Sequence, residues 1–395
     1  MIDKRWSLPL VSLMIVGCSE DIPTVSLGID DHYRVYRMQK LPLTPELTGK
    51  SYRWSTTDGE ILSTEKDYIF LAEKEGVYGI VFEIIDEESP YHFEFTVTVL
   101  HEEVDYSPYI SKVYEYCPAP GQFINTMPEY EPGDDYADML KKVEESISGT
   151  NDNIVSLGGF GGYLTFGFDH TVVNRPGEKD FMILGNSFYQ LSSTSDRKGG
   201  SSEPGIVMVS YDRNCNGVHD DEWYELAGSD YNNSATLKNY TITYHRPDPN
   251  REKVSEGVLT DVNYIAWEDS EGVQAYMPQN SFHRNDYYPL WIKEDTLSFS
   301  GTRLPANGED QSGTGAYYVL YCFDWGYVDN HPNDYLDLNS FDISWAVDSE
   351  GRSVNLPGVD FIRVYTGVNQ YCGWIGETST EIIRAQDLHV LVSKF

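Results

Sequence analysis

Side chains that carry oxygen recur at alternate positions in the run Asp212–Glu222. Counting from Asp212, they occupy positions 1, 3, 5 and 9, and a glycine occupies position 6. This is the layout of an EF-hand-type calcium loop, because Ca²⁺ takes about six to eight oxygen ligands and the glycine allows a sharp turn between them. We therefore predict a structural Ca²⁺ site in this loop. Its ligands are Asp212, Asn214, Asn216, the carbonyl oxygen of Val218, Asp220 and Glu222.

Two positions of this loop depart from the calcium pattern. Trp223 stands at position 12, where a bidentate glutamate is usual, so Glu222 or Asp221 would have to replace that ligand. Cys215 stands where a glycine or another small residue is expected. The alternative is a polar hairpin loop in which the same side chains close Asx turns by bonding to nearby backbone N–H groups.

A second candidate site lies in the run Phe323–Asp334, which combines aromatic rings, carboxylates and amides. A small-molecule site needs flat apolar walls and a few oriented polar groups. We predict that Trp325 contacts a ligand, together with Trp374 from another loop that contains glycine. Polar contacts are expected from Tyr327, Asn330 and His331. The alternative is that these residues belong to the core and to turns.

Motifs of known catalytic centres are missing from the sequence. It contains no GxSxG or HExxH, and Gly158–Gly162 lacks the ending of a phosphate-binding loop. Acidic residues number 63 against 28 Lys and Arg, which gives a formal net charge of −35. Such a chain repels polyphosphates, and no basic patch offsets this, so nucleic acid is not expected as a partner. We expect a binding protein without catalytic activity.

The elements that position these residues are expected to be strands, so the predicted fold class is all-β. Hydrophobic residues make up 40% of the 395, and 33 Gly and 19 Pro indicate many turns. We predict an immunoglobulin-like sandwich within residues 18–112, which include a linker, followed by a larger jelly-roll-like sandwich over 113–395. One short helix is expected over 134–148. The later strands are expected at 164–168, 181–184, 206–209, 317–323, 341–347, 361–365 and 388–392.

The first residues have the pattern of an export signal. Lys4 and Arg5 precede the apolar run Leu8–Val16, which is shorter than the roughly 20 residues that span a bilayer. Ile15–Cys18 resembles the lipobox of bacterial lipoproteins, so we expect residues 1–17 to be removed and Cys18 to be lipidated. The alternative is an ordinary secretory signal.

Several longer segments together resemble one family, the Bacteroidetes cell-surface lipoproteins that have a PKD-like N-terminal domain and a jelly-roll-like C-terminal domain. The segments are CPAPGQFIN, GGFGGYLTFGFDHTVVNRPGEKDFMILGNSF, EPGIVMVSYDRNCNGVHDDEWYELAGSDY, FDWGYVDNHPN and PGVDFIRVYTGVNQYCGWIGETSTEI. The resemblance implies a lipid-anchored protein on the outer membrane that captures a ligand for an outer-membrane transporter. It implies a corrinoid such as cobalamin as that ligand; the alternative function is glycan binding or adhesion.

Overall fold

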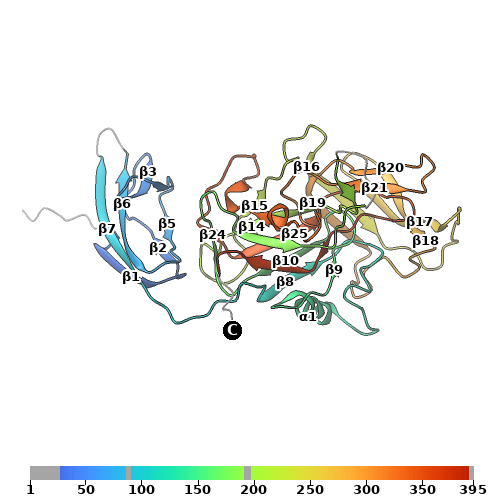
Figure 1. Cartoon of the computed structure of the whole chain (residues 1–395), viewed down its shortest axis with the longest axis horizontal. Coiled ribbons are helices and arrows are strands. Elements are labelled where there is room, and N and C mark those ends of the chain that lie inside the picture. The colour runs from blue at the N-terminus through green and yellow to red at the C-terminus, as the bar shows by residue number, and fades with distance from the viewer. Residues whose placement is uncertain (1–26, 86–89, 191–196, 391–395) are drawn as a thin grey trace, which may run out of the picture. The chain divides into compact units, whose positions relative to one another are not determined.

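The computed structural model describes residues 27–85, 90–190 and 197–390 and is mostly β-strand, which confirms the predicted class (Figure 1). The signal segment and Cys18 lie outside the described residues. Two compact units are present. One comprises residues up to Tyr33 with Leu43–Tyr68 and Gly79–Thr96, and the other comprises Arg34–Pro42, Ile69–Tyr78 and the chain from Val97 onward. The boundary at residue 112 stays a prediction. No helix in the described ranges is long and apolar enough to cross a membrane.

The strands are short, as the many turns predict. The first are β1 His32–Tyr36, β2 Leu41–Leu43, β3 Tyr52–Thr56, β4 Ile61–Ser63, β5 Tyr68–Phe70, β6 Gly76–Ile84 and β7 Tyr91–Leu100. Next come β8 Lys112–Cys117, helix α1 Tyr136–Ile147, β9 Val155–Ser156, β10 Tyr163–Gly167, β11 Val172–Val173, β12 Phe181–Leu184, β13 Gly199–Gly200, β14 Gly205–Ser210 and β15 Trp223–Leu226. The remainder are β16 Leu237–His245, β17 Leu259–Asp269, β18 Gln274–Asn280, β19 Thr296–Arg303, β20 Gly308–Asp310, β21 Tyr318–Tyr321, β22 Ser340–Phe341, β23 Ala346–Val347, β24 Gly358–Val359, β25 Phe361–Thr366, β26 Glu381–Ile382 and β27 Arg384–Asp387.

Trp54 is the centre of the smaller unit's core. It is fully buried on β3 and lies beside Phe82, its partner on β6, with 4.5 Å between the ring centroids. Phe95 meets the same indole edge-on at 6.4 Å. The indole Nε1 donates to the carbonyl oxygen of Glu65 at 3.0 Å, so its one polar group is satisfied. These contacts are those expected of a small sandwich that uses its aromatic residues for its own core.

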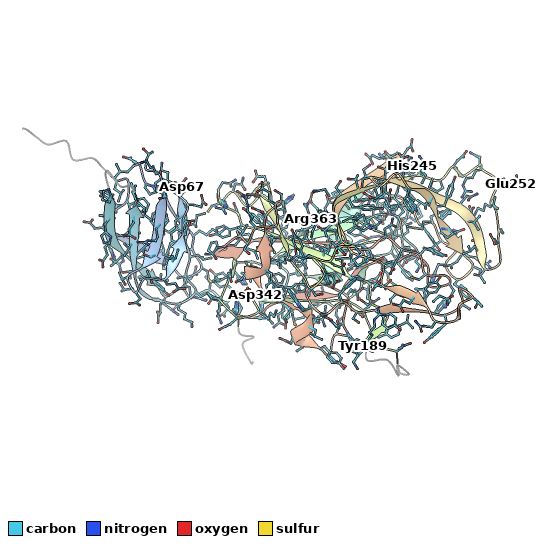
Figure 2. All side chains as sticks on the ribbon, turned by 90° about the horizontal axis from the view of Figure 1, so that it is seen from above. Asp67, Tyr189, His245, Glu252, Asp342 and Arg363 are labelled. Atoms are coloured by element: carbon cyan, nitrogen blue, oxygen red, sulfur yellow. The ribbon has the colours of Figure 1, made fainter. Side chains whose placement is uncertain are left out.

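The larger unit is organised around a six-stranded antiparallel sheet, in the order β23-β15-β14-β25-β10-β8. On one face Leu164 pairs with Val364, and these apolar side chains enter the core. On the other face Arg363, labelled in Figure 2, lies between the rings of Tyr163 and Trp223 at 4.5 and 4.4 Å. Because successive side chains of a strand point to opposite faces, each strand contributes to both layers.

Two hydrophobic cores result, one on each side of this sheet. The first contains the buried face of α1, which lies beside β8 (Figure 1), and the sheet β22-β12-β27. The second core lies between the six-stranded sheet and the four-stranded sheet β18-β17-β16-β19. Its buried side chains include Phe160, Ile206, Tyr240, Ile242, Tyr244, Ile265, Met277, Phe299 and Tyr365. The arrangement is that of a sandwich, as predicted.

The helix forms where its sequence signals place it. Asp135 is the N-cap: its side chain accepts the N–H groups of Ala137 and Asp138, and Asp138 bonds back to the cap N–H. Met139 and Val143 follow at helical spacing and are fully buried. The expected bounds of 134–148 therefore exceed the observed helix only by its two caps, Asp135 and Ser148, and by Asp134.

Two expected strands differ from the structure. The run 341–347 is interrupted by a short 3-10 helix, Ile343–Trp345, because the Asp342 side chain accepts the N–H of Ser344 and starts a turn. A strand over 388–392 is contradicted over its described part. Asp387 Oδ1 accepts the N–H groups of His389 and Val390, which bends the chain there, so β27 ends at Asp387. Residues 391 and 392 lie outside the described part of the chain.

We predict that Phe181→Ala lowers the free energy of unfolding by about 3–5 kcal/mol, because a large buried ring is lost and leaves a cavity. Phe181 is fully buried on β12 and stacks on Phe341 with 5.5 Å between centroids. Urea denaturation measures the effect. Phe188 is 60% exposed, so Phe188→Ala should change stability by no more than about 0.5 kcal/mol. Equal effects of the two substitutions would contradict this core.

Candidate functional site

Five consecutive polar residues, Glu377–Glu381, are buried together: none of them is more than 2% exposed. They continue into β26, which pairs with β9. Buried polar groups must find hydrogen-bond partners, because each unpaired one costs about 1–3 kcal/mol. The segment therefore determines the positions of the groups around it.

Most of these partners come from distant parts of the chain. Ser379 Oγ lies 2.6 Å from Ser156 Oγ and accepts the N–H of Gly158. Thr380 Oγ1 donates to the carbonyl oxygen of Glu203 at 2.8 Å. Ser156 Oγ also donates to Glu381 Oε1 at 2.9 Å. The segment thus connects β9, the glycine turn that follows it and the chain that enters β14.

Three carboxyl groups meet at one end of this segment. One oxygen from each of Glu203, Asp329 and Glu381 lies within 4.8 Å of the others. Asp329 Oδ1 accepts the N–H groups of Asn186 and Ser187, both at 2.7 Å, and Oδ2 accepts the N–H of Glu381 at 3.0 Å. Glu203 is the least buried of the three. We call these residues the acidic triad.

The pKa values of the acidic triad are raised because its carboxyl groups are buried with no cationic side chain beside them in the described part of the chain. Within the described ranges, none of the three carboxylates forms an ion pair with Lys, Arg or His. Burial raises the pKa of Asp329 to about 7. Burial and the neighbouring acids raise the pKa values of Glu203 and Glu381 well above the usual range. Oxygen donors at this spacing suit a hard cation such as Ca²⁺, so the triad could hold one.

Glu377, at the other end of the segment, has one unsatisfied oxygen. Its Oε1 accepts the N–H of Gln122 at 2.6 Å, whereas its buried Oε2 has no hydrogen-bond partner among the described residues. Burial raises the pKa of Glu377 to about 8, so this carboxyl group is mostly protonated at neutral pH. With Oε1 already accepting, the proton belongs on Oε2. Glu377 therefore offers an O–H donor that the protein does not use.

Glu377 is one of the residues that line a cavity of about 280 Å³, which we call the Glu377 pocket. Trp267 and Met277 contribute from β17 and β18, and Arg303 contributes from the end of β19. The other lining residues are Gly159, Phe160, Asp269, Val273, Tyr276, Val368, Asn369, Gln370, Tyr371 and Thr378. The pocket combines aromatic walls with the Arg303 guanidinium, the Asn369 amide and the free donor of Glu377.

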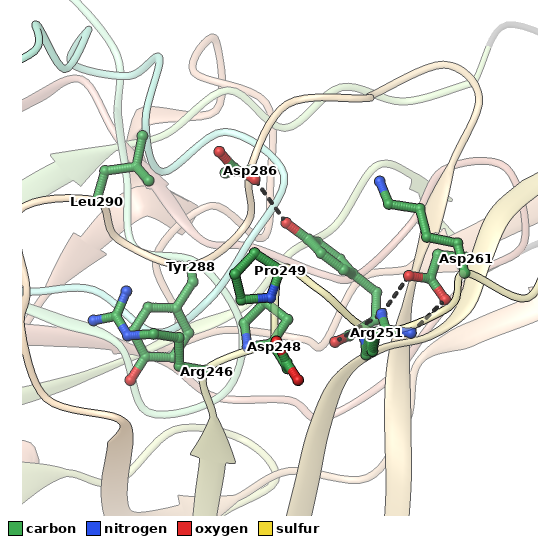
Figure 3. Close-up of a pocket in the computed structure, with 11 residues that line it drawn as sticks. Arg246, Asp248, Pro249, Arg251, Asp261, Asp286, Tyr288 and Leu290 are labelled. Atoms are coloured by element: carbon green, nitrogen blue, oxygen red, sulfur yellow. Dashed lines mark hydrogen bonds and ion pairs between the residues drawn. The ribbon is translucent and has the colours of Figure 1, made fainter.

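Another cavity, of about 330 Å³, lies near Arg246 (Figure 3). Here most of the charged groups already have partners. Arg251 makes a two-pronged ion pair with the buried carboxylate of Asp261, and Tyr264 donates to Asp286 Oδ1 at 3.1 Å. Arg246 Nη2 donates to two backbone carbonyl oxygens. Because these polar groups are satisfied, this cavity has less need of a ligand than the Glu377 pocket.

Of the five predicted ligand contacts, the structure exposes the two tryptophans. Trp325 is 39% exposed and Trp374 is 45% exposed, and no ring contact or hydrogen bond among the described residues joins them. The other three are buried. Tyr327 Oη accepts the N–H of Asp230, Asn330 bonds to both backbone groups of Phe323, and His331 Nδ1 lies 2.9 Å from Tyr189 Oη. These three bonding patterns are those of core and turn residues, and ligand contact by any of the five residues stays a prediction.

The predicted calcium loop is closed by its own side chains. Asp212 accepts the N–H groups of Asn216 and Gly217, and Asn216 Oδ1 accepts that of Val218. Asn214 Nδ2 and Asn216 Nδ2 both reach Asp220, while Glu222 accepts the hydroxyl of Tyr224. Such Asx turns were the alternative to a metal site. Ca²⁺ binding by this loop stays a prediction.

Sequence reasoning did not find Glu377, Trp267 or the acidic triad. A run of Glu, Thr and Ser reads as an exposed turn, and only long-range contacts reveal that this one is buried. A faint signal was available: Ile375 lies two residues before the run, Ile382 follows it directly, and no proline interrupts it.

Comparisons with known proteins give distant similarities only. No family model and no curated protein matches the chain. A quinoprotein alcohol dehydrogenase-like protein from Bacteroides thetaiotaomicron is 12% identical, with 63% of this chain and 47% of that chain covered and a TM-score of 0.17. A SusE-like protein is 9% identical; the match covers 90% of this chain and 95% of that protein, with a TM-score of 0.24. A carbohydrate-binding module of the β-sandwich superfamily is 9% identical; the match covers 90% of this chain and 92% of that module, with a TM-score of 0.14.

We predict that Glu377→Gln makes stability less dependent on pH. The raised pKa of Glu377 means that the folded protein keeps a proton which the unfolded chain releases above about pH 4.5. The stability that this retained proton contributes is fully present below about pH 4.5 and is lost as the pH rises through about 8. The wild-type free energy of unfolding should therefore fall between about pH 5 and 8. Glutamine cannot ionise, so the slope should become shallower by up to about 1.4 kcal/mol per pH unit.

Urea denaturation at several pH values measures this slope. The control is Glu271→Gln, at an exposed turn residue, which should leave the slope unchanged. A wild-type stability that does not vary between about pH 5 and 8 would contradict the buried, protonated state of Glu377.

We predict that Ca²⁺ raises the melting temperature and that Asp212→Ala removes this rise. A cation that binds only the folded protein adds about 2.7 kcal/mol at 100 times its dissociation constant. Asp329→Asn in the acidic triad should leave the rise intact. The reverse pattern would place the cation in the triad and contradict the loop, and a melting temperature unaffected by Ca²⁺ and EDTA would refute both sites.

Proposed function

We propose that this protein is a non-catalytic surface lipoprotein that captures a carbohydrate in the Glu377 pocket. Cys18 would anchor it to the outer membrane, and an outer-membrane transporter would receive the ligand. The observation that carries the proposal is that Glu377, whose buried Oε2 lacks a hydrogen-bond partner among the described residues, lines the same cavity as Trp267, Arg303 and Asn369.

The chemistry of the pocket suits a sugar ring. A pyranose presents C–H groups on its faces, which pack against an aromatic ring, and hydroxyl groups around its edge, which both donate and accept hydrogen bonds. Trp267 supplies an aromatic wall. Arg303 and the protonated Glu377 supply donors, and the Asn369 amide supplies a donor and an acceptor. A ligand hydroxyl that accepts from Glu377 Oε2 would remove the cost of leaving this donor unpaired.

The size of the cavity favours a sugar over the corrinoid that the family resemblance implies. About 280 Å³ lies just below the range for small-molecule pockets, about 300–1,000 Å³. A corrin macrocycle with its axial groups is several times larger than one hexose. Cobalamin binding therefore serves as the competing outcome in the test below.

We predict that Trp267→Ala weakens glycan binding at least about tenfold, equivalent to about 1.4 kcal/mol. The full-length mature protein is titrated by calorimetry with glucose, with linear α- and β-linked gluco-oligosaccharides and, separately, with cobalamin. Glu377→Ala should weaken binding to a similar degree, whereas Glu377→Gln, which keeps an N–H donor, should retain most of it.

The matched control is Trp325→Ala, which removes another partly exposed tryptophan away from the pocket. It should leave glycan affinity unchanged. Loss of binding in Trp325→Ala but not in Trp267→Ala would move the site to the Phe323–Asp334 loop. Binding of cobalamin without binding of any sugar would overturn the proposed ligand class.

A further inference from the structure

A short hairpin extends outward from the Glu377 pocket. Tyr371 and Glu377 pair across its base, and both line the pocket. Within the hairpin, Cys372 N–H donates to the carbonyl oxygen of Gly376 at 2.7 Å. Trp374 lies in its turn and is 45% exposed. The same few residues therefore contribute to the pocket and present an indole ring to solvent.

The hairpin is held rigidly. Gly373 and Gly376 have φ values of +58° and +98°, which residues with side chains rarely adopt. Gln122 Nε2 donates to the carbonyl oxygen of Ile375 at 2.7 Å, so the turn is fixed to a neighbouring loop. A Cβ at Gly376 would overlap that Gln122 side chain. The Trp374 ring is therefore presented from a fixed backbone, which lowers the entropy cost of binding against it.

Phe282 completes an exposed aromatic pair with Trp374. It is 58% exposed, and the two ring centroids are 6.0 Å apart at an interplanar angle of 68°. Asn280 connects the two: its Oδ1 accepts the N–H of Phe282, and its Nδ2 donates to the carbonyl oxygen of Trp374. Asn280 is itself fully buried. The buried Asn280 side chain thus holds the backbone of both residues, whose rings are exposed to solvent.

The pair is continuous with the pocket along two chain segments. Asn280 ends β18, three residues after Met277 in the pocket wall, and a strand rises about 3.3 Å per residue. The aromatic pair therefore begins on the order of 10 Å from that wall. The hairpin provides the second connection, from Glu377 at its base to Trp374 in its turn.

We propose that Phe282 and Trp374 form a second sugar platform and that the ligand is an oligosaccharide or polysaccharide with one ring in the Glu377 pocket. This inference rests on the proposed function and specifies its ligand as a chain instead of a free monosaccharide. The pocket holds one ring through hydrogen bonds, and the aromatic pair packs against a later ring of the same chain. Two contacts on one rigid ligand then add affinity that a monosaccharide cannot gain.

The test compares chain lengths. The full-length protein is titrated with glucose, maltose and maltotetraose, and with cellobiose and cellotetraose. For one of the two linkage types, affinity should rise at least about tenfold from glucose to the tetrasaccharide. Trp374→Ala should remove most of that gain without changing the affinity for glucose, and Phe282→Ala should act in the same direction. Phe188→Ala, at another exposed phenylalanine, should have no effect.

The outcomes separate this inference from the proposed function. Sugar binding that needs Trp267 but does not change with chain length, or that survives Trp374→Ala at full strength, overturns the platform and leaves the pocket in place. Tetrasaccharide binding that needs Trp374 but not Trp267 or Glu377 supports the platform and refutes the pocket. If no sugar of either series binds, both are refuted.

Discussion

The buried polar segment Glu377–Glu381 is the constraint on which the rest of the larger unit depends. Each of its side chains has left water, so each needs a partner inside the protein. Those partners come from β9, from the chain before β14 and from β25, where Thr366 Oγ1 accepts the N–H of Thr380. A network of this kind permits only one arrangement of the strands that it joins. Within this segment, Glu377 Oε2 is the buried side-chain oxygen that has no hydrogen-bond partner among the described residues.

The same burial determines the charge state of the site. In a chain with 63 acidic residues, carboxylates on the surface repel one another but stay solvated. Asp329 and Glu381 are buried, Glu203 is partly buried, and no cationic side chain in the described part of the chain pairs with any of them, so backbone N–H groups and protons stabilise them instead. Glu377 is protonated for the same reason, which turns an acidic residue into a hydrogen-bond donor. The chemistry offered to a ligand is therefore a consequence of packing.

Local features of this fold were predictable from the sequence, and long-range ones were not. The helix after Asp135 and the strand Phe181–Leu184 follow from capping and hydrophobic periodicity, which act over a few residues. The strand expected over 388–392 was wrong over its described residues, 388–390, because one aspartate, Asp387, bends the chain. The pocket escaped prediction because its walls come from segments more than 200 residues apart, and the burial of Glu377 depends on all of them. Of the predicted ligand residues, only Trp374 lies on an element that also lines this pocket.

A crystal structure of the protein with a bound oligosaccharide tests the central claim most directly. If Glu377 is the unsatisfied donor of a sugar site, a sugar oxygen will lie within hydrogen-bond distance of Oε2, about 2.5–3.0 Å, with its ring against Trp267. A sugar found instead in the cavity beside Arg246, or against Trp325, with the Glu377 pocket free of ligand, would contradict the account.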